Sequence, residues 1–231
     1  MKIKIGQELN GASGLLYKLA LRRIARSYHP YQPVSINGKP ICPGERKHSD
    51  RFAVIRNVIE SIGAKTVLDL GCAEGYFVEQ AATQCGCIAL GIDADVRRLS
   101  LAQASVALNR VQGAGFMYGE LTPEFVRMLP MFDGILFMSL LHHMMYERGV
   151  PYALEYMKEL RAKTSKFLIF DMGQSDETEN AWASLLPDMG SHPHLWVQQF
   201  LESAGFSKVE KLADSDAYQG STKRALFCLI P

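Results

Sequence analysis

The sequence predicts an α/β protein with a doubly wound, mostly parallel seven-stranded sheet whose last strand is antiparallel. Strand-like apolar runs alternate with helical patterns from about residue 49, which is typical of βαβ units. Two strand-like runs follow the last helical pattern and would close the sheet. The 231 residues are 48% hydrophobic, which is ample for one large core. We expect this domain over residues 49–231, preceded by a helical and proline-rich extension over 1–48.

Composition and charge narrow the class of protein. The formal net charge of +1 gives no global argument for a nucleic-acid partner. No signal-peptide pattern opens the sequence, and no apolar run reaches transmembrane length. We therefore expect a soluble, cytoplasmic chain, at most peripheral to the inner face of a membrane. The five cysteines form no C-x-x-C pair, so we expect reduced thiols and no zinc site at Cys42, Cys72, Cys85, Cys87 and Cys228.

A basic amphipathic helix is predicted near the start, over residues 13–27. Lys18, Arg22 and Arg26 repeat every four residues on one face, and apolar side chains occupy the other. Such a helix can dock on its own domain, lie on an anionic membrane or contact a polyanion such as RNA. The sequence leaves these three alternatives open.

The next segment, residues 28–46, contains four prolines and cannot form a regular helix. An Asn-Gly turn predicts a small hairpin over 34–41. Long irregular segments often cover binding sites, so the candidates to cover a ligand are Tyr28, Tyr31, Arg46 and Lys47. A solvated linker is the alternative. A helix is expected to follow over about 49–62 and to end at a glycine.

The most informative stretch is a βαβ unit over residues 67–93. A buried strand over 67–70 runs into a turn over 71–75 that contains two glycines. A second strand over 87–92 ends at Asp93. In such a unit the turn and the helix N-terminus face a ligand, and the terminal acid can accept hydrogen bonds from ribose hydroxyls. The intervening helix is indicated by apolar residues at helical period, namely Phe77, Val78, Ala81, Ala82 and Cys85.

The turn Asp69-x-Gly71-x-Ala73-x-Gly75 resembles the first motif of the class I S-adenosylmethionine-dependent methyltransferases. The resemblance implies that Gly71 lets the backbone approach the methionine part of the cofactor, that Gly75 allows close helix packing, and that Asp69 orients the loop. Asp93 falls where that family holds the ribose. A crossover that binds no ligand is the alternative. The full set of cofactor residues that the resemblance implies is Asp69, Gly71, Cys72, Ala73, Gly75, Tyr76, Phe77, Asp93, Ala94, Glu120 and Ser139.

The elements after this unit continue the alternation of helix and strand. A helix is predicted over 95–109, a third strand over 116–118 and a short helix over 123–129. Glu120 follows the third strand, where the resembled family often reads the adenine amino group, and an exposed loop glutamate is the alternative. The apolar run over 135–138 predicts a fourth, buried parallel strand.

Two adjacent histidines follow the fourth strand. Ligands of open α/β sheets bind beyond the carboxyl ends of the strands, so Ser139, His142 and His143 lie where chemistry is expected. A histidine there could take a proton from a hydroxyl during methyl transfer, since its ordinary pKa lies near neutrality. We expect adjacent histidines to point in different directions, so that at most one is the base. The alternative is a structural role in stacking or hydrogen bonding.

The last predicted elements are helices from Pro151 and from Pro193 and strands over 167–170, 208–212 and 224–230. Metal-dependent O-methyltransferases of the catechol type carry an acid after the fourth strand and an Asp-Asn pair after the fifth. This sequence has neither, so we expect no metal. The irregular segment between the fifth strand and the last helix would lie beside the active face, and its candidates to meet an acceptor are Gln174, Glu177, Trp182 and His192.

A narrower resemblance concerns the run D-L-G-C-A-E-G-Y-F and the His-His pair. Both are similar to the methyltransferase domain of bifunctional enzymes that cap bacterial O-antigen chains. This implies a sugar, sugar phosphate or glycolipid acceptor in polysaccharide or small-molecule biosynthesis. An RNA methyltransferase and a non-catalytic binding module are the alternatives. A hydroxyl acceptor needs a base, His142 or His143, whereas a phosphate needs cations, for which the candidates are Arg46, Lys47, Arg51, Lys223 and Arg224.

Overall fold

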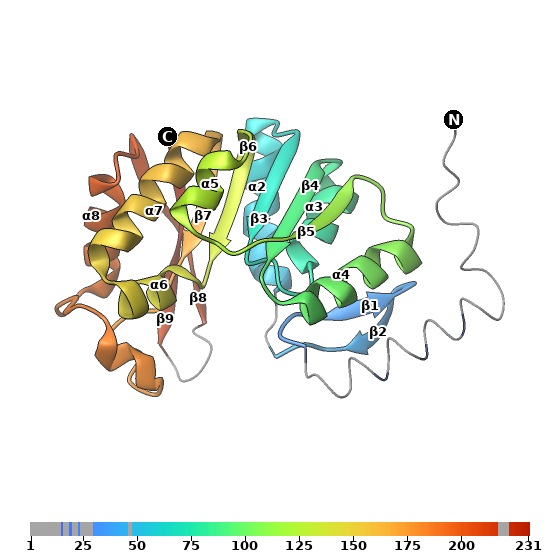
Figure 1. Cartoon of the computed structure of the whole chain (residues 1–231), viewed down its shortest axis with the longest axis horizontal. Helices are drawn as coiled ribbons and strands as arrows, with labels where there is room; N and C mark the ends of the chain where they lie inside the picture. Colours follow the sequence, from blue (N-terminus) through green and yellow to red (C-terminus); the bar gives the residue numbers. More distant parts are fainter. Residues whose placement is uncertain (1–14, 16–18, 20–22, 24–29, 46–47, 217–221) are drawn as a thin grey trace.

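A seven-stranded sheet forms the centre of the molecule (Figure 1). The computed structural model describes residues 15, 19, 23, 30–45, 48–216 and 222–231. The strand order is β5-β4-β3-β6-β7-β9-β8. Strand β9 runs antiparallel to both of its neighbours, and the other paired strands are parallel, which confirms the predicted fold class. The bounds are β3 (Thr66–Leu70), β4 (Ile88–Asp93), β5 (Ala114–Tyr118), β6 (Phe132–Met138), β7 (Thr164–Asp171), β8 (Lys208–Asp216) and β9 (Lys223–Ile230).

Helices cover both faces of this sheet. Side chains alternate along each strand, so Leu68 and Leu70 of β3 enter one core cluster while Val67 enters the other. Each cluster is closed by its own group of helices. The cluster with Leu68 and Leu70 is covered by α5 (Pro123–Met128), α6 (Leu141–Arg148), α7 (Val150–Lys163) and α8 (Pro193–Ser203). The cluster with Val67 is covered by α2 (Ser49–Ile62), α3 (Tyr76–Cys85) and α4 (Val96–Asn109).

The predicted hairpin is present and docks on α4. It consists of β1 (Val34–Ile36) and β2 (Lys39–Cys42), which pair antiparallel. Ile36 packs in a small core with apolar side chains of α4. The Asn109 side chain accepts from the Asn37 N–H at 2.8 Å and donates to the Ser35 carbonyl at 2.9 Å. The proline-rich segment is therefore attached to the α/β body.

Part of the predicted N-terminal helix lies outside the described residues. Residues 15, 19 and 23 are helical, and Leu15 and Leu19 are exposed. Among the described residues, no helix has the length and apolar character needed to span a bilayer. The residues of the basic face and three candidates of the following segment lie outside the description, namely Lys18, Arg22, Arg26, Tyr28, Arg46 and Lys47.

The structure adds a helix that the sequence pattern did not predict. Helix α6 begins directly after β6, so both histidines lie in the first turn of a helix. Leu141 and Met145, one turn apart, are buried on its core side. The sequence pattern hides this helix because the apolar run of β6 continues almost unbroken into its first residue. A short 3-10 helix, η1 (Ala181–Leu185), lies in the segment predicted to be irregular.

The centre of the sheet contains its topological switch point. Strands β3 and β6 are neighbours, and the chain continues from them toward opposite edges. A crevice forms at the carboxyl ends of such strands, because the connections leave to opposite faces. The turn after β3 and the residue after β6, Ser139, both lie at this edge, so the two regions that the sequence singled out meet there.

We expect Gly75→Ala to lower the free energy of unfolding by about 2–4 kcal/mol, since it combines a left-handed backbone with a clash. Gly75 has a φ of 79°, and a Cβ there would lie 2.5 Å from the Phe116 ring and 2.9 Å from Ala102 Cβ. Urea unfolding measures the change. Gly86→Ala is the matched control, because its φ is 65° and no atom lies within 4 Å of the added Cβ. Equal losses in both variants would contradict a packing role for Gly75.

Candidate functional site

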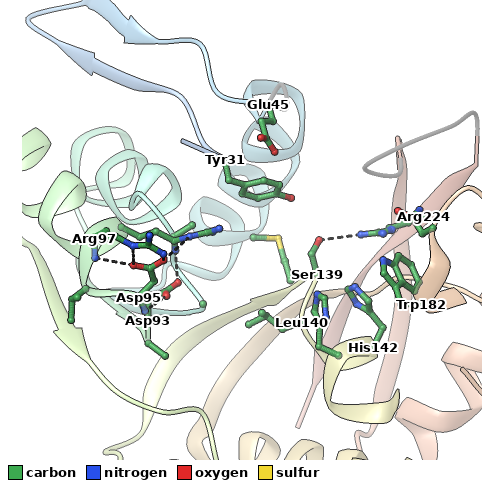
Figure 2. Close-up of a pocket in the computed structure, with 18 residues that line it drawn as sticks. Tyr31, Glu45, Asp93, Asp95, Arg97, Ser139, Leu140, His142, Trp182 and Arg224 are labelled. Atoms are coloured by element: carbon green, nitrogen blue, oxygen red, sulfur yellow. Dashed lines mark hydrogen bonds and ion pairs between the residues drawn. The ribbon is translucent and has the colours of Figure 1, made fainter. Parts of the chain in front are cut away.

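A cavity of about 970 Å³ opens at the carboxyl edge of the sheet (Figure 2). One wall comes from the turn after β3 and the start of α4, and the opposite wall comes from the end of β6, helix α6, η1 and β9. Tyr31 and Glu45 of the N-terminal segment lie at its rim, above both walls. The lining residues include Gly71, Ala73 and Asp93 on the first wall and Ser139, His143 and Trp182 on the second.

Asp93 ties the turn to the end of β4. Its Oδ2 accepts from the Ala73 N–H at 2.9 Å, and its Oδ1 accepts from the Asp95 N–H at 2.8 Å. Two hydrogen bonds leave a carboxylate with further acceptor capacity. The carboxylate is therefore fixed at the cavity wall and can still accept hydrogen bonds from a ligand.

Asp69 lies beneath the same turn and is buried. Its Oδ2 accepts no hydrogen bond from any residue in the described part of the chain. Burial, and secondly the charge of Asp93, raises the pKa of Asp69 to about 8. Asp69 does not line the large cavity but a small cleft next to it, which shares Gly71 and Ser139 with the cavity. An unsatisfied buried carboxyl group is a candidate partner for a cationic or hydrogen-donating ligand group.

The N-terminal segment is pinned onto this turn. The Gln32 side chain accepts from the Tyr76 N–H, the first of α3, at 2.8 Å. Glu74 accepts from the backbone N–H groups of Tyr31 at 3.2 Å and Gln32 at 2.9 Å. Burial raises the pKa of Glu74 although these hydrogen bonds oppose the shift. Tyr31 is thereby held at the cavity rim, which is where a covering residue was predicted.

Arg51, one of the residues predicted to bind the substrate, forms a buried ion pair. Arg51 Nη2 lies 2.9 Å from Asp171 Oδ2, and both side chains are almost fully buried. Asp171 Oδ1 also accepts from the Ser139 N–H at 2.7 Å and from its hydroxyl at 2.9 Å. Arg51 lines the small cleft rather than the large cavity, so the structure places its charge in the core and away from the expected acceptor.

A second buried pair, between Arg224 and Glu177, lies at the second wall of the cavity, which Arg224 lines. Arg224 Nε and Nη2 donate to the two oxygens of Glu177, each at 2.6 Å. Arg224 Nη1 donates to the Ser139 hydroxyl at 3.3 Å, and the guanidinium lies 5.8 Å from the Trp182 ring centre. Burial opposes the charge of Arg224, but Glu177 and Asp171 outweigh it and raise its pKa. Trp182, a candidate to meet an acceptor, lines the cavity.

Gln174 takes a structural position instead of a cavity position. It is buried, its N–H donates to Glu177 at 3.0 Å, and its side chain donates to the Lys223 carbonyl at 3.2 Å. The sequence predicted that Gln174 could meet an acceptor, and it indicated Arg224 only as a candidate cation for a phosphate. Glu177 and Arg224 are 47 positions apart, and no local pattern would pair residues at that separation.

The two histidine rings pack against each other, which contradicts the expectation that they diverge. Their centroids lie 4.2 Å apart at an interplanar angle of 36°, and the Trp182 ring lies 4.5 Å from that of His142. His142 Nδ1 accepts from the Gly173 N–H at 3.1 Å, so the neutral ring carries its proton on Nε2. Burial, and then the neighbouring His143 and Arg224, lowers the pKa of His142 to about 2. His142 is therefore a hydrogen-bond donor toward the cavity and is unsuited to act as a base.

His143 is better suited than His142 to act as a base. It is half-buried and lines both the large cavity and an adjoining one of about 310 Å³. Its Nδ1 lies 2.9 Å from the Tyr146 hydroxyl. Burial, and to a lesser degree Arg224, lowers the pKa of His143, while Glu147 opposes the shift. The ring is thus neutral at ordinary pH and has one nitrogen left to meet a ligand.

The other predicted cofactor residues fall into two groups. Glu120 lines the adjoining cavity together with Asp93, Ala94 and Leu140. The remaining three contribute to the packing around the turn. Cys72 is buried, Phe77 lies in the core, and the Tyr76 ring packs edge-on against that of Phe77 with centroids 5.3 Å apart.

The proton on Asp69 makes stability depend on pH. Because its folded pKa of about 8 exceeds the unfolded value of 3.8, the folded state holds a proton that the unfolded state loses. Stability should therefore decline as pH rises through this window and level off above it. Asp69→Asn, which cannot ionise, should lack this decline. Urea unfolding at pH 5, 7 and 9 should show the wild type losing a few kcal/mol relative to the variant, up to about 1.4 kcal/mol per pH unit. Parallel pH curves would show that Asp69 stays ionised.

No family model and no curated protein sequence matches the chain. Solved structures do match. WbdD, described as a bifunctional kinase-methyltransferase, matches with a TM-score of 0.76 at 22% identity, over 91% of this chain and 46% of WbdD. The N-terminal domain of EvdMO1, crystallised in the presence of S-adenosylhomocysteine and D-fucose, gives 0.64 at 18%, over 92% and 96% of the two chains. Magnesium protoporphyrin IX methyltransferase (ChlM) from Synechocystis PCC 6803, with bound S-adenosylhomocysteine, gives 0.59 at 16%, over 79% and 83%.

These similarities concern the fold. The chain spans about half the length of the WbdD chain it matches, and the identities lie between 16% and 22%. The chain therefore has the fold of the class I S-adenosylmethionine-dependent methyltransferases, as the turn motif predicted.

Proposed function

We propose that the chain is an S-adenosylmethionine-dependent methyltransferase that acts on a hydroxyl oxygen of a sugar or glycan acceptor. The observation that carries the proposal is the arrangement of the large cavity. Asp93 and the turn after β3 form one wall, and His143 lies on the opposite wall. A cofactor held by the first wall would present its methyl group to an acceptor held by the second.

The residues of the first wall fit the cofactor. Asp93 keeps acceptor capacity for ribose hydroxyls after its two backbone hydrogen bonds. Asp69 lines the small cleft beside this wall, and its buried oxygen without a hydrogen-bond partner among the described residues suits the ammonium group of the methionine part once the carboxyl group has lost its proton. The adjoining cavity, lined by Glu120, Ala94 and Leu140, suits the adenine. When bound, S-adenosylmethionine would supply a methyl group on a sulfonium, which reacts readily with a nucleophile.

The second wall supplies what a hydroxyl acceptor needs. A hydroxyl becomes a nucleophile when a base takes its proton, and neutral His143 is the group suited to this. His142 can hold an acceptor oxygen through Nε2–H, and Trp182, which lines the cavity, can contribute apolar surface for a sugar ring. Tyr31 at the rim would help to exclude water.

Charge compensation in the cavity favours a neutral acceptor over a phosphate. Arg224 is paired in bidentate fashion with Glu177, and Arg97 is paired with Asp95 at 3.0 Å. Arg98 also lies within 3.9 Å of Asp95. A phosphate would have to compete with these carboxylates for the described cations of the cavity wall.

The comparisons support the same direction. The EvdMO1 domain was crystallised with S-adenosylhomocysteine and D-fucose, and WbdD is described as a kinase-methyltransferase. The presence of D-fucose is consistent with a sugar acceptor. A place in polysaccharide or small-molecule biosynthesis belongs to the same proposal. Contact of residues 13–27 with an anionic membrane surface belongs to the same proposal, since lipid-linked glycans would be presented there.

Cofactor binding is tested first by titration calorimetry with S-adenosylmethionine and S-adenosylhomocysteine. We expect micromolar binding by the wild type and, in Asp93→Ala, binding weaker by about 10- to 100-fold, because hydrogen bonds to a charged group are worth about 1.5–3 kcal/mol. Asp133→Ala is the matched control. Asp133 also accepts hydrogen bonds from two backbone N–H groups, at 2.7 Å and 3.4 Å, but it lies at the amino ends of the strands. Absence of binding by folded wild type would overturn the proposal in favour of a non-catalytic module.

The base is tested with the sugar that gives the fastest methylation in a panel beginning with D-fucose. We expect His143→Gln to lower kcat by about 10²- to 10⁴-fold, because a general base is lost. Affinity for S-adenosylhomocysteine should be unchanged. Mass spectrometry of the methylated product gives the rate. An unchanged kcat in His143→Gln would refute the role, and methylation of RNA instead of sugars would move the proposal to the other class of acceptor.

A further inference from the structure

The polar segment between β7 and α8 places two residues at the large cavity. Asn180, which directly precedes η1, and Trp182, inside η1, both line it. The backbone of Asn180 is fixed on both sides, because its N–H donates to the Glu177 carbonyl at 2.9 Å and its carbonyl accepts from the Ala183 N–H at 3.0 Å. The sequence pattern did not indicate Asn180, since an asparagine in a polar segment is typical of an ordinary turn.

The side-chain amide of Asn180 is oriented by Glu177. Its Nδ2 lies 3.5 Å from the Glu177 carboxylate, which Arg224 holds through two hydrogen bonds. A carboxylate can only accept, so the amino group of the amide must face Glu177. The Oδ1 of Asn180 then points away from Glu177, and no residue in the described part of the chain donates a hydrogen bond to it. Because Asn180 lines the cavity, this oxygen is an acceptor that a ligand can use.

Trp182 forms the next part of the same wall. A Cβ at Gly173 would clash with the Trp182 ring, so this ring packs directly on the backbone that follows β7. The ring lies 4.5 Å from that of His142, and the Arg224 guanidinium lies 5.8 Å from its centre (Figure 2). His142 presents Nε2–H, since its Nδ1 accepts from the Gly173 N–H. The wall therefore offers an apolar ring, a hydrogen-bond donor and a hydrogen-bond acceptor.

We propose that Asn180 determines acceptor specificity by accepting a hydrogen bond from a sugar hydroxyl other than the one that is methylated. The inference rests on the proposed function for the choice of a sugar as ligand. A sugar carries apolar C–H surface and several hydroxyls, each of which can donate and accept. Its complement in a binding site is apolar surface with a few placed polar groups, as on this wall. A phosphate group that is ionised at pH 8 has no proton to donate to Asn180.

Specificity follows from the cost of leaving the Asn180 oxygen without a partner. In the free protein, water in the cavity can donate to Oδ1. A bound sugar displaces that water, so a sugar that lacks the matching hydroxyl leaves the oxygen unpaired. The penalty concerns one position of the sugar ring. We therefore expect Asn180 to discriminate between sugars by the presence of a single hydroxyl.

Sugar affinity can be measured by titrating ¹⁵N-labelled protein at pH 8 with D-fucose, D-galactose and D-mannose, with and without S-adenosylhomocysteine. The chain has two tryptophans, so Trp196→Phe assigns the indole N–H signal of Trp182, and the shift of this signal gives the Kd. Monodeoxy analogues of the sugar that binds best are then compared. In Asn180→Ala, this sugar should bind about 3- to 10-fold more weakly than in the wild type, because one hydrogen bond is lost. One deoxy analogue should bind equally to both proteins.

Ser184→Ala is the matched control, because Ser184 is exposed in the same short helix and does not line the cavity. It should leave every affinity unchanged. Asn180→Ser keeps an oxygen that can accept and should lose less affinity than Asn180→Ala. A merely structural role for Asn180 would weaken the binding of every analogue by the same factor. That result, or equal affinities in the wild type and Asn180→Ala, would overturn the inference.

The outcomes also separate this inference from the proposed function. Binding of S-adenosylhomocysteine without binding of any sugar in the panel would overturn the inference and leave the cofactor assignment in place. The expected selectivity of Asn180 in a protein that binds no cofactor would overturn the proposed methyl transfer and leave the sugar site. Where methylation is found, Asn180→Ala should raise KM for the sugar by the same 3- to 10-fold or so and leave the affinity for S-adenosylhomocysteine unchanged.

Discussion

The buried carboxylate of Asp171 is the interaction on which the carboxyl edge of the sheet depends. It binds Arg51 of α2 and both polar groups of Ser139, and Ser139 in turn accepts from Arg224, which is paired with Glu177. One continuous network thus joins the first helix of the α/β body to its last strand. Removing one member would leave a buried charge without its partner, which costs about 3–5 kcal/mol. Ser139 is also held at a φ of 59°, a conformation that needs such support.

This network fixes the relative position of the two walls of the cavity. The wall that the proposal assigns to the cofactor comes from the turn after β3, the end of β4 and the start of α4, and the wall assigned to the acceptor comes from the end of β6, α6, η1 and β9. The walls come from the two halves of the sheet, which meet at the switch point between β3 and β6. The N-terminal segment closes the arrangement from above, because Gln32 and Glu74 pin it to the turn. The geometry of the site is therefore a property of the whole sheet.

Burial also sets the protonation states of titratable groups at the site. It lowers the pKa of His142 so far that the ring stays neutral and donates through Nε2, and it raises the pKa of Asp69 so that this carboxyl group holds a proton near neutral pH. The cations at the wall are balanced by Glu177 and Asp95. A site with compensated charges, a fixed donor and a neutral histidine suits proton transfer from an uncharged hydroxyl better than the capture of an anion.

The sequence by itself determined the βαβ unit, the seven strands, the hairpin and the place of Asp93, because apolar period, glycine turns and strand order are written in neighbouring residues. It also brought Ser139 and the histidines to the correct edge. Only the tertiary structure decided that Arg51 and Gln174 are buried, that the two histidine rings pack against each other, and that His142 carries its proton on Nε2. Those outcomes depend on partners such as Asp171, 120 positions from Arg51, and Arg224, 47 from Glu177. Contacts of that separation leave no local pattern, since they form only when the two halves of the sheet close on each other.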